Sequence, residues 1–137
     1  MLPRGLRNNN PGNIRHNKDK FQGEVVPSKD AAFKQFTSMA YGYRAMFVTL
    51  GTYLMRDRRD TIEKIITAWA PASENNTEGY IAQVERLSGV RRDKRLTPAS
   101  GTDYIKIVAA MSRVENGQAA DLLEVEDGFD LQAKITR

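Results

Sequence analysis

Four asparagines in one short segment form the group of side chains best suited to holding a polar ligand. Residues 7–15 read Arg-Asn-Asn-Asn-Pro-Gly-Asn-Ile-Arg, which contains Asn8, Asn9, Asn10 and Asn13. Each amide offers an acceptor and two donors on a short stem, and Pro-Gly favours a tight turn. The segment can form a rigid loop that directs amides at a neutral ligand rich in hydroxyl and amide groups, such as an amino sugar. The alternative is a solvated turn whose asparagines satisfy their own backbone.

Carboxylates are the available groups for acid–base chemistry. The chain has no cysteine and one histidine, His16, which argues against thiolate metal sites, His-based metal sites and a Ser-His-Asp triad. Glu24 lies between apolar residues, and a carboxyl group against apolar walls can act as a general acid near neutral pH. Glu74 follows Trp-Ala-Pro in a polar loop. The alternative for each is a solvated carboxylate or a helix cap.

Two tyrosines are candidates for contact with a sugar ring. Tyr41 precedes a glycine, and Tyr80 follows an Asn-Asn-Thr segment. An aromatic face with a polar tip suits a sugar, although it equally suits a core with one wet edge. No phosphate-binding glycine loop, zinc spacing or aromatic-basic RNA signature is present, so the sequence predicts no metal and no cofactor.

The elements that must position these residues divide the chain into two parts within one domain. Residues 1–37 are rich in glycine and proline, which predicts loops and a small β-hairpin around 21–26 and 32–36. Residues 38–125 show apolar residues at three- and four-residue steps, which predicts helices over about 38–56, 60–70, 77–89 and 102–116 and a shorter one over 118–123. The tail, 126–137, reads as a loop. The expected fold class is mainly α (α+β).

Charge and hydropathy limit the partners. The net charge is +4, which favours polyanions such as nucleic acid or an acidic wall polymer. Basic runs at 56–59 and 91–95 could form a polyanion patch, although such runs are usually solvated surface. The sequence predicts no membrane span and no signal peptide, and therefore synthesis in a bacterial cytoplasm.

Four blocks in this order resemble phage and prophage structural (virion) proteins that are similar to lysozyme-like muralytic enzymes. The first block is residues 4–15. The second is Phe-x-x-Phe at 33–36 followed by Tyr-Gly-Tyr-Arg-Ala at 41–45. The third is residues 61–71, which end in Trp-Ala-Pro, and the fourth is residues 74–81, which begin Glu-Asn-Asn-Thr. Together the blocks cover most of the chain.

The resemblance implies a lysozyme-like fold and cleavage of peptidoglycan glycan strands by a lytic transglycosylase or muramidase. In such enzymes one glutamate protonates the glycosidic oxygen, and hydrolases add a second carboxylate. The acid usually ends a helix that precedes the Asn-rich region, but here only six residues precede Arg7 and none is a carboxylate. Glu24 is the first candidate for the acid and Glu74 the second. The four asparagines, Tyr41 and Tyr80 would bind the substrate.

Two other functions remain open at this stage. A non-catalytic virion or cell-wall-binding protein on the same fold would explain the missing helix-borne glutamate. A nucleic-acid-binding helical domain would explain the positive charge but leaves the Asn-rich segment without a role. The sequence does not choose between hydrolysis and transglycosylation, and it leaves the route to the cell wall and the oligomeric state open.

Overall fold

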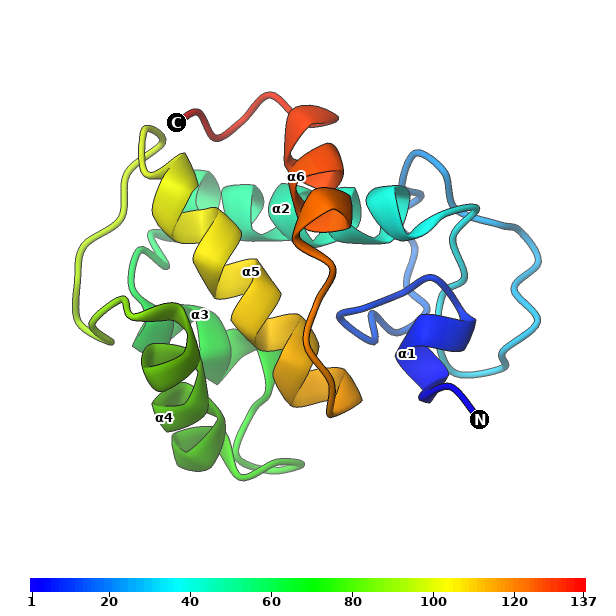
Figure 1. Ribbon diagram of the computed structural model, residues 1–137, viewed down its shortest axis with the longest axis horizontal. Coiled ribbons are helices and arrows are strands. Elements are labelled where there is room, and N and C mark those ends of the chain that lie inside the picture. Colours follow the sequence, from blue (N-terminus) through cyan, green and yellow to red (C-terminus); the bar gives the residue numbers. More distant parts are fainter.

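The computed structural model describes all residues, 1–137, and is mainly helical (Figure 1). The helices are α1 (Arg4–Arg7), α2 (Met39–Asp57), α3 (Ile62–Trp69), α4 (Thr77–Ser88), α5 (Gly101–Asn116) and α6 (Leu122–Asp130). No β-sheet is present, and two isolated antiparallel bridges are the extent of strand pairing.

Helices α2 to α5 begin and end close to the positions that the sequence predicts. Ser38 caps α2 by accepting a hydrogen bond from the Tyr41 N–H, and Thr61 caps α3 in the same way. Gly89 and Gly117 end α4 and α5 in the left-handed conformation that glycine adopts without strain. The predicted helices of this part are therefore confirmed. The apolar periodicity and the capping residues of the sequence indicate the same helix ends.

The helical part is built around α5. Most of its residues are buried, including Tyr104, Ile107 and Met111, and it packs against α4, α6 and α2. Helix α2 crosses the molecule in Figure 1 and packs mainly against α6. One cluster of 22 buried apolar residues joins these helices, and all of them lie between Tyr43 and Ile135. The main apolar cluster therefore lies in the helical part, and Ile14 of the N-terminal residues packs against it.

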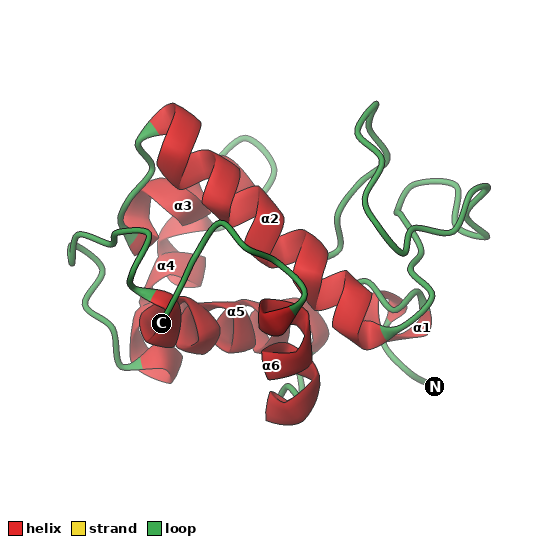
Figure 2. Cartoon of the chain, turned by 90° about the horizontal axis from the view of Figure 1, so that it is seen from above, coloured by secondary structure: helices red, strands yellow, loops and turns green.

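Residues 1–38 form a lobe of loops and α1 beside the N-terminal end of α2 (Figure 2). The predicted hairpin is wrong. Residues 21–26 and 32–36 do run antiparallel, with the Val25 N–H donating to the Gln35 carbonyl and a bridge between Glu24 and Phe36. However, the bridge between Glu24 and Phe36 is isolated, and Gly23 beside it has a φ of 80°, outside the strand region.

The C-terminal residues also differ from expectation. The first part of the predicted loop 126–137 is helical, because α6 runs from Leu122 to Asp130, whereas the sequence predicts a helix over 118–123. Asp121 caps α6, and Phe129 packs edge-on against Phe47 with ring centroids 5.3 Å apart. Ile135 is also buried, so the tail completes the core rather than fraying.

No helix of the chain has both the length and the apolar composition required to cross a lipid bilayer.

Candidate functional site

The main concavity is a groove of about 760 Å³ between the N-terminal lobe and the helical part. Its volume is within the range of ligand-binding clefts. It contains aromatic, amide, hydroxyl and charged side chains, and it is open to solvent. The lining residues are Gly12, Asn13, Ile14, Arg15, Asn17, Asp19, Lys20, Phe21, Gln22, Arg44, Val48, Thr49, Thr52, Tyr53, Arg56, Trp69 and Glu74.

One wall of the groove is a single face of α2. Its residues recur at three- and four-residue steps, as one face of a helix requires: Arg44, Val48, Thr49, Thr52, Tyr53 and Arg56. The opposite face of α2 is buried in the core. Because that burial fixes the rotation of the helix, it also fixes the direction of this polar wall.

The opposite wall is the loop 12–22, and Trp69 lies where the walls meet. A Cβ atom placed on Gly12 would lie 2.7 Å from the Trp69 ring and 3.0 Å from the Met46 side chain. The Pro-Gly turn thus packs directly on the end of α3, which only a glycine allows. This contact holds the Asn-rich segment at the edge of the groove.

Glu74, the second sequence candidate for the acid, lines the groove. It lies exposed in the loop between α3 and α4, where its N–H donates to the Pro71 carbonyl. Asn76 follows and caps α4 by accepting from the Gly79 N–H. These two hydrogen bonds hold the backbone of the loop that carries Glu74. Asp19 is the other carboxylate of the lining, and sequence reasoning missed it.

Glu24, the first sequence candidate, lies outside the groove in a buried ion pair. Lys34 Nζ contacts both carboxylate oxygens of Glu24 at 3.0 and 3.1 Å and also donates to the Asp19 carbonyl. The exposed fractions of the two side chains are 0% for Lys34 and 3% for Glu24. A carboxylate held in this way braces the lobe, and the geometry gives it no access to a ligand.

Three of the four asparagines hold the lobe together. Asn10 is fully buried, and its Nδ2 donates to the Ile14 and Lys34 carbonyls while its Oδ1 accepts from the Ile14 N–H. Asn9 has a φ of 51° and donates to the Phe36 carbonyl. These amides satisfy backbone groups that have no strand partner. The Asn9 and Asn10 side chains satisfy backbone groups of the lobe, and Asn8, Asn9 and Asn10 all lie outside the groove lining.

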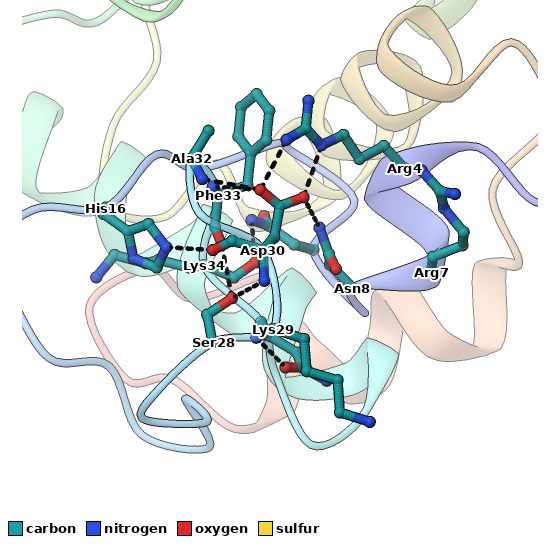
Figure 3. Close-up of polar contacts among 12 residues, drawn as sticks. Arg4, Arg7, Asn8, His16, Ser28, Lys29, Asp30, Ala32, Phe33 and Lys34 are labelled. Atoms are coloured by element: carbon teal, nitrogen blue, oxygen red, sulfur yellow. Dashed lines mark hydrogen bonds and ion pairs between the residues drawn. The ribbon is translucent and has the colours of Figure 1, made fainter.

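Asn8 belongs to a second polar cluster centred on Asp30 (Figure 3). The Asp30 carboxylate accepts two hydrogen bonds from the Arg4 guanidinium, at 2.6 and 2.8 Å, and one from Asn8. It also accepts from the N–H groups of Ala32 and Phe33. The Arg4 guanidinium first, and then these N–H groups, hold the pKa of Asp30 well below its usual range. The cluster ties α1 to the loop 28–34.

The fourth asparagine joins the lobe to the helical part through a glutamate that sequence reasoning missed. Asn13 lines the groove, has a φ of 50°, and donates through Nδ2 to Glu115 Oε1 at 2.9 Å. The Tyr80 hydroxyl donates to Glu115 Oε2, also at 2.9 Å. Burial, and then the Glu115 charge, raise the pKa of Tyr80 well above its usual value, so its hydroxyl remains a donor. No local signal marks Glu115, because it lies 102 residues from Asn13.

The two tyrosines proposed for sugar contact do not line the groove. Tyr80 is buried beneath it on Glu115, and Tyr41 packs over Gly23, where a Cβ atom would meet the tyrosine ring. The aromatic side chains of the groove are instead Phe21, Tyr53 and Trp69. No group of three or more histidine, cysteine or acidic side chains is arranged to hold a metal ion.

Comparison with known proteins places the chain among bacteriophage proteins. No protein-family model matches it. However, it is 37% identical over 131 residues to "Protein P5" of Pseudoalteromonas phage PM2, which covers 93% of this chain and 80% of that protein. The chain belongs to the phage protein P5 family. Because the match includes nearly all of the chain, the groove residues of both walls lie within a P5-like sequence.

Proposed function

We propose that this P5-like protein cleaves the glycan strand of peptidoglycan in the groove between the lobe and α2. The observation that carries the proposal is the groove itself, where Phe21, Tyr53 and Trp69 accompany amide and hydroxyl side chains and a carboxylate from an anchored loop. Aromatic faces beside polar groups suit sugar rings. In this proposal the long helix α2 and the lobe flank the cleft of a lysozyme-like arrangement.

Glu74 is the proposed proton donor. It would protonate the glycosidic oxygen as the bond from that oxygen to the anomeric carbon breaks. In the transglycosylase reaction the 6-hydroxyl of the same sugar then attacks the anomeric carbon and gives its proton to the Glu74 carboxylate, which has just donated its own. In the hydrolase reaction water attacks the anomeric carbon and gives its proton to Glu74 or Asp19.

The test is the release of soluble muropeptides from purified sacculi, measured by mass spectrometry. We expect wild-type protein to release products and Glu74→Gln to reduce their rate by about 100-fold or more, the usual range for a general acid. Glu63→Gln is the matched control, because Glu63 is an exposed glutamate outside the groove. Wild type and Glu74→Gln releasing equal amounts, whether background or substantial, would overturn the assignment.

The product also assigns the role of Asp19, the second groove carboxylate. Anhydro-sugar ends identify transglycosylation, which needs no second carboxylate, and we then expect Asp19→Asn to retain activity. Reducing ends identify hydrolysis, and Asp19→Asn should then lose activity together with Glu74→Gln.

A non-catalytic wall-binding role is the second candidate, and one observation favours it. Both groove carboxylates belong to exposed residues of the free protein, and the buried glutamate, Glu24, is neutralised by Lys34. This role predicts retention on insoluble peptidoglycan without any product. A nucleic-acid role has less support, because Arg91, Arg92, Lys94 and Arg95 are all engaged with carboxylates.

Membership in a phage protein family supports a role in the virion or in a prophage product that acts at the cell wall. We propose that the protein is carried in phage particles. Mass spectrometry of purified particles tests this, and consistent absence of the protein from infectious particles contradicts it.

A further inference from the structure

The groove carries more positive than negative charge, and the positive groups lie on both walls. Arg44 and Arg56 are on the α2 wall, and Arg15 and Lys20 are on the loop opposite. The only acidic residues of the lining are Asp19 and Glu74. A neutral sugar polymer gives these four cations nothing to bind, so the glycan proposal alone leaves them unexplained.

Three of the four cations have no carboxylate partner in the protein. Arg44 donates only its Nε, to the Leu131 carbonyl. The Arg15 guanidinium stacks over the Phe33 ring at 5.0 Å, and Lys20 makes no ion pair. Arg56 contacts Asp57 at 3.3 Å, but its side chain is 75% exposed. Arg15, Lys20 and Arg44 differ in this respect from the run at 91–95, where every basic side chain is paired with a carboxylate of the protein.

The two arginines of the α2 wall are widely spaced along the groove. They lie twelve residues apart on one helix, which corresponds to about 18 Å at 1.5 Å per residue. Val48 and Tyr53 lie between them and provide apolar contact. The wall thus presents a cation, an apolar and hydroxyl surface, and a second cation. Such an order fits an extended chain that carries anionic groups at intervals.

We propose that the groove selects a glycan that bears carboxylates and discriminates against a neutral amino-sugar polymer. The inference rests on the proposed function and names the substrate chemistry of the same site. Guanidinium groups pair with carboxylates through two parallel hydrogen bonds. The terminal nitrogens of Arg44 have no partner in the protein, and the exposed Arg56 would exchange Asp57 for a lactyl or peptide carboxylate of the strand.

The test uses the fluorescence of Trp69, the single tryptophan of the chain, which lines the groove. The ligands are uncross-linked peptidoglycan oligosaccharides with free carboxylates, the same oligosaccharides after amidation of those carboxylates, and single-stranded DNA. We expect the free-carboxylate form to bind about tenfold more tightly than the amidated form at low salt, with the difference shrinking as salt is added.

The decisive variant removes one cation from each wall. Lys20→Gln/Arg56→Gln should lose about tenfold in affinity for the carboxylate form and little for the amidated form. The matched control is Arg86→Gln/Lys106→Gln, which removes the same charge from exposed, unpaired positions outside the groove. The control should bind both forms as wild type does.

Four outcomes overturn the inference. They are equal affinity for the free and amidated oligosaccharides, an equal loss in the control variant, tighter binding of DNA through the same two side chains, and no binding of either oligosaccharide. Failure of the cleavage proposal is distinguishable. Selective binding without muropeptide release leaves this inference standing, whereas equal cleavage of free and amidated substrate removes it and leaves the cleavage proposal standing.

Discussion

The lobe and the helical part are held together by different forces. The cluster of 22 buried apolar residues lies wholly in the helical part, where helices satisfy most of their own backbone groups. The lobe has no sheet and only one short helix, and its buried groups include Lys34 and Asn10. A region with little regular structure must pair its backbone with side chains. Polar geometry therefore shapes one wall of the groove and apolar burial shapes the other.

The largest loss of stability in the lobe, relative to the helical part, is expected at the Lys34–Glu24 pair. Lys34→Met leaves the Glu24 carboxylate buried without a partner, which costs about 3–5 kcal/mol. It also removes the hydrogen bond to the Asp19 carbonyl in the groove loop. We expect native-state hydrogen exchange to show opening of residues 8–37, while the amides of α5 remain protected.

Two variants make that result specific. Lys34→Met/Glu24→Leu removes both charges and should recover part of the stability, since no buried charge is left unpaired. Ile66→Ala, in the helical core, should cost about 2–5 kcal/mol and accelerate exchange throughout the helices. Equal opening of helices and lobe in Lys34→Met would show that the two parts are not held separately.

A smaller effect is expected at Asn10, whose amide serves three backbone groups. Asn10→Ala leaves buried donors and acceptors unpaired, at a cost of about 1–3 kcal/mol in the free energy of unfolding of the lobe. Asn17→Ala, at an exposed position in the same lobe, should change stability by less than about 0.5 kcal/mol. Hydrogen exchange of both variants measures the difference, and equal stability would assign Asn10 no bracing role.

The smallest effect is expected at Asp30 and depends on pH. The Arg4 guanidinium and the N–H groups lower the pKa of Asp30 in the folded protein. Its contribution is therefore present above the ordinary carboxyl pKa of about 4 and is lost as the pH falls toward the lowered value. We expect the stability of the lobe to decline from about pH 5 toward pH 2, and Asp30→Asn to be less stable at pH 7 with a shallower decline.

Asp93→Asn is the control for that titration, because Asp93 is an exposed carboxylate paired with an exposed arginine. Its pH profile should follow that of wild type. An unchanged slope in Asp30→Asn would remove Asp30 as the group responsible.

The sequence predicts the structure of the helical part better than that of the lobe. Helices α2 to α5 are set by local periodicity and by caps such as Ser38 and Thr61, so their positions could be predicted. Helix α6 could not, because Val125 and Phe129 lie among acidic residues and a glycine, and their burial depends on packing against α2. In the lobe, register depends on long-range side-chain bonds, which no local pattern reveals.

The candidate site was likewise predictable only where local sequence signals mark it. The Asn-rich segment indicated a structured loop, but its sequence does not tell which amides face inward; three do, and Asn13 lies on the groove. The role of Glu115 could not be predicted, because only the folded chain brings it into hydrogen-bond contact with Asn13 and Tyr80. Arg44 and Arg56 are candidate ligand-binding residues only because both lie on the face of α2 that lines the groove and is not buried in the core.

The most direct test of the central claim is a structure of Glu74→Gln with a peptidoglycan oligosaccharide that carries free carboxylates. We expect the sugar chain along the α2 wall, with the side chain at position 74 within about 3 Å of a glycosidic oxygen and strand carboxylates against Arg44 or Arg56. An oligosaccharide seated outside the groove, or one whose glycosidic oxygens all lie far from position 74, would contradict it.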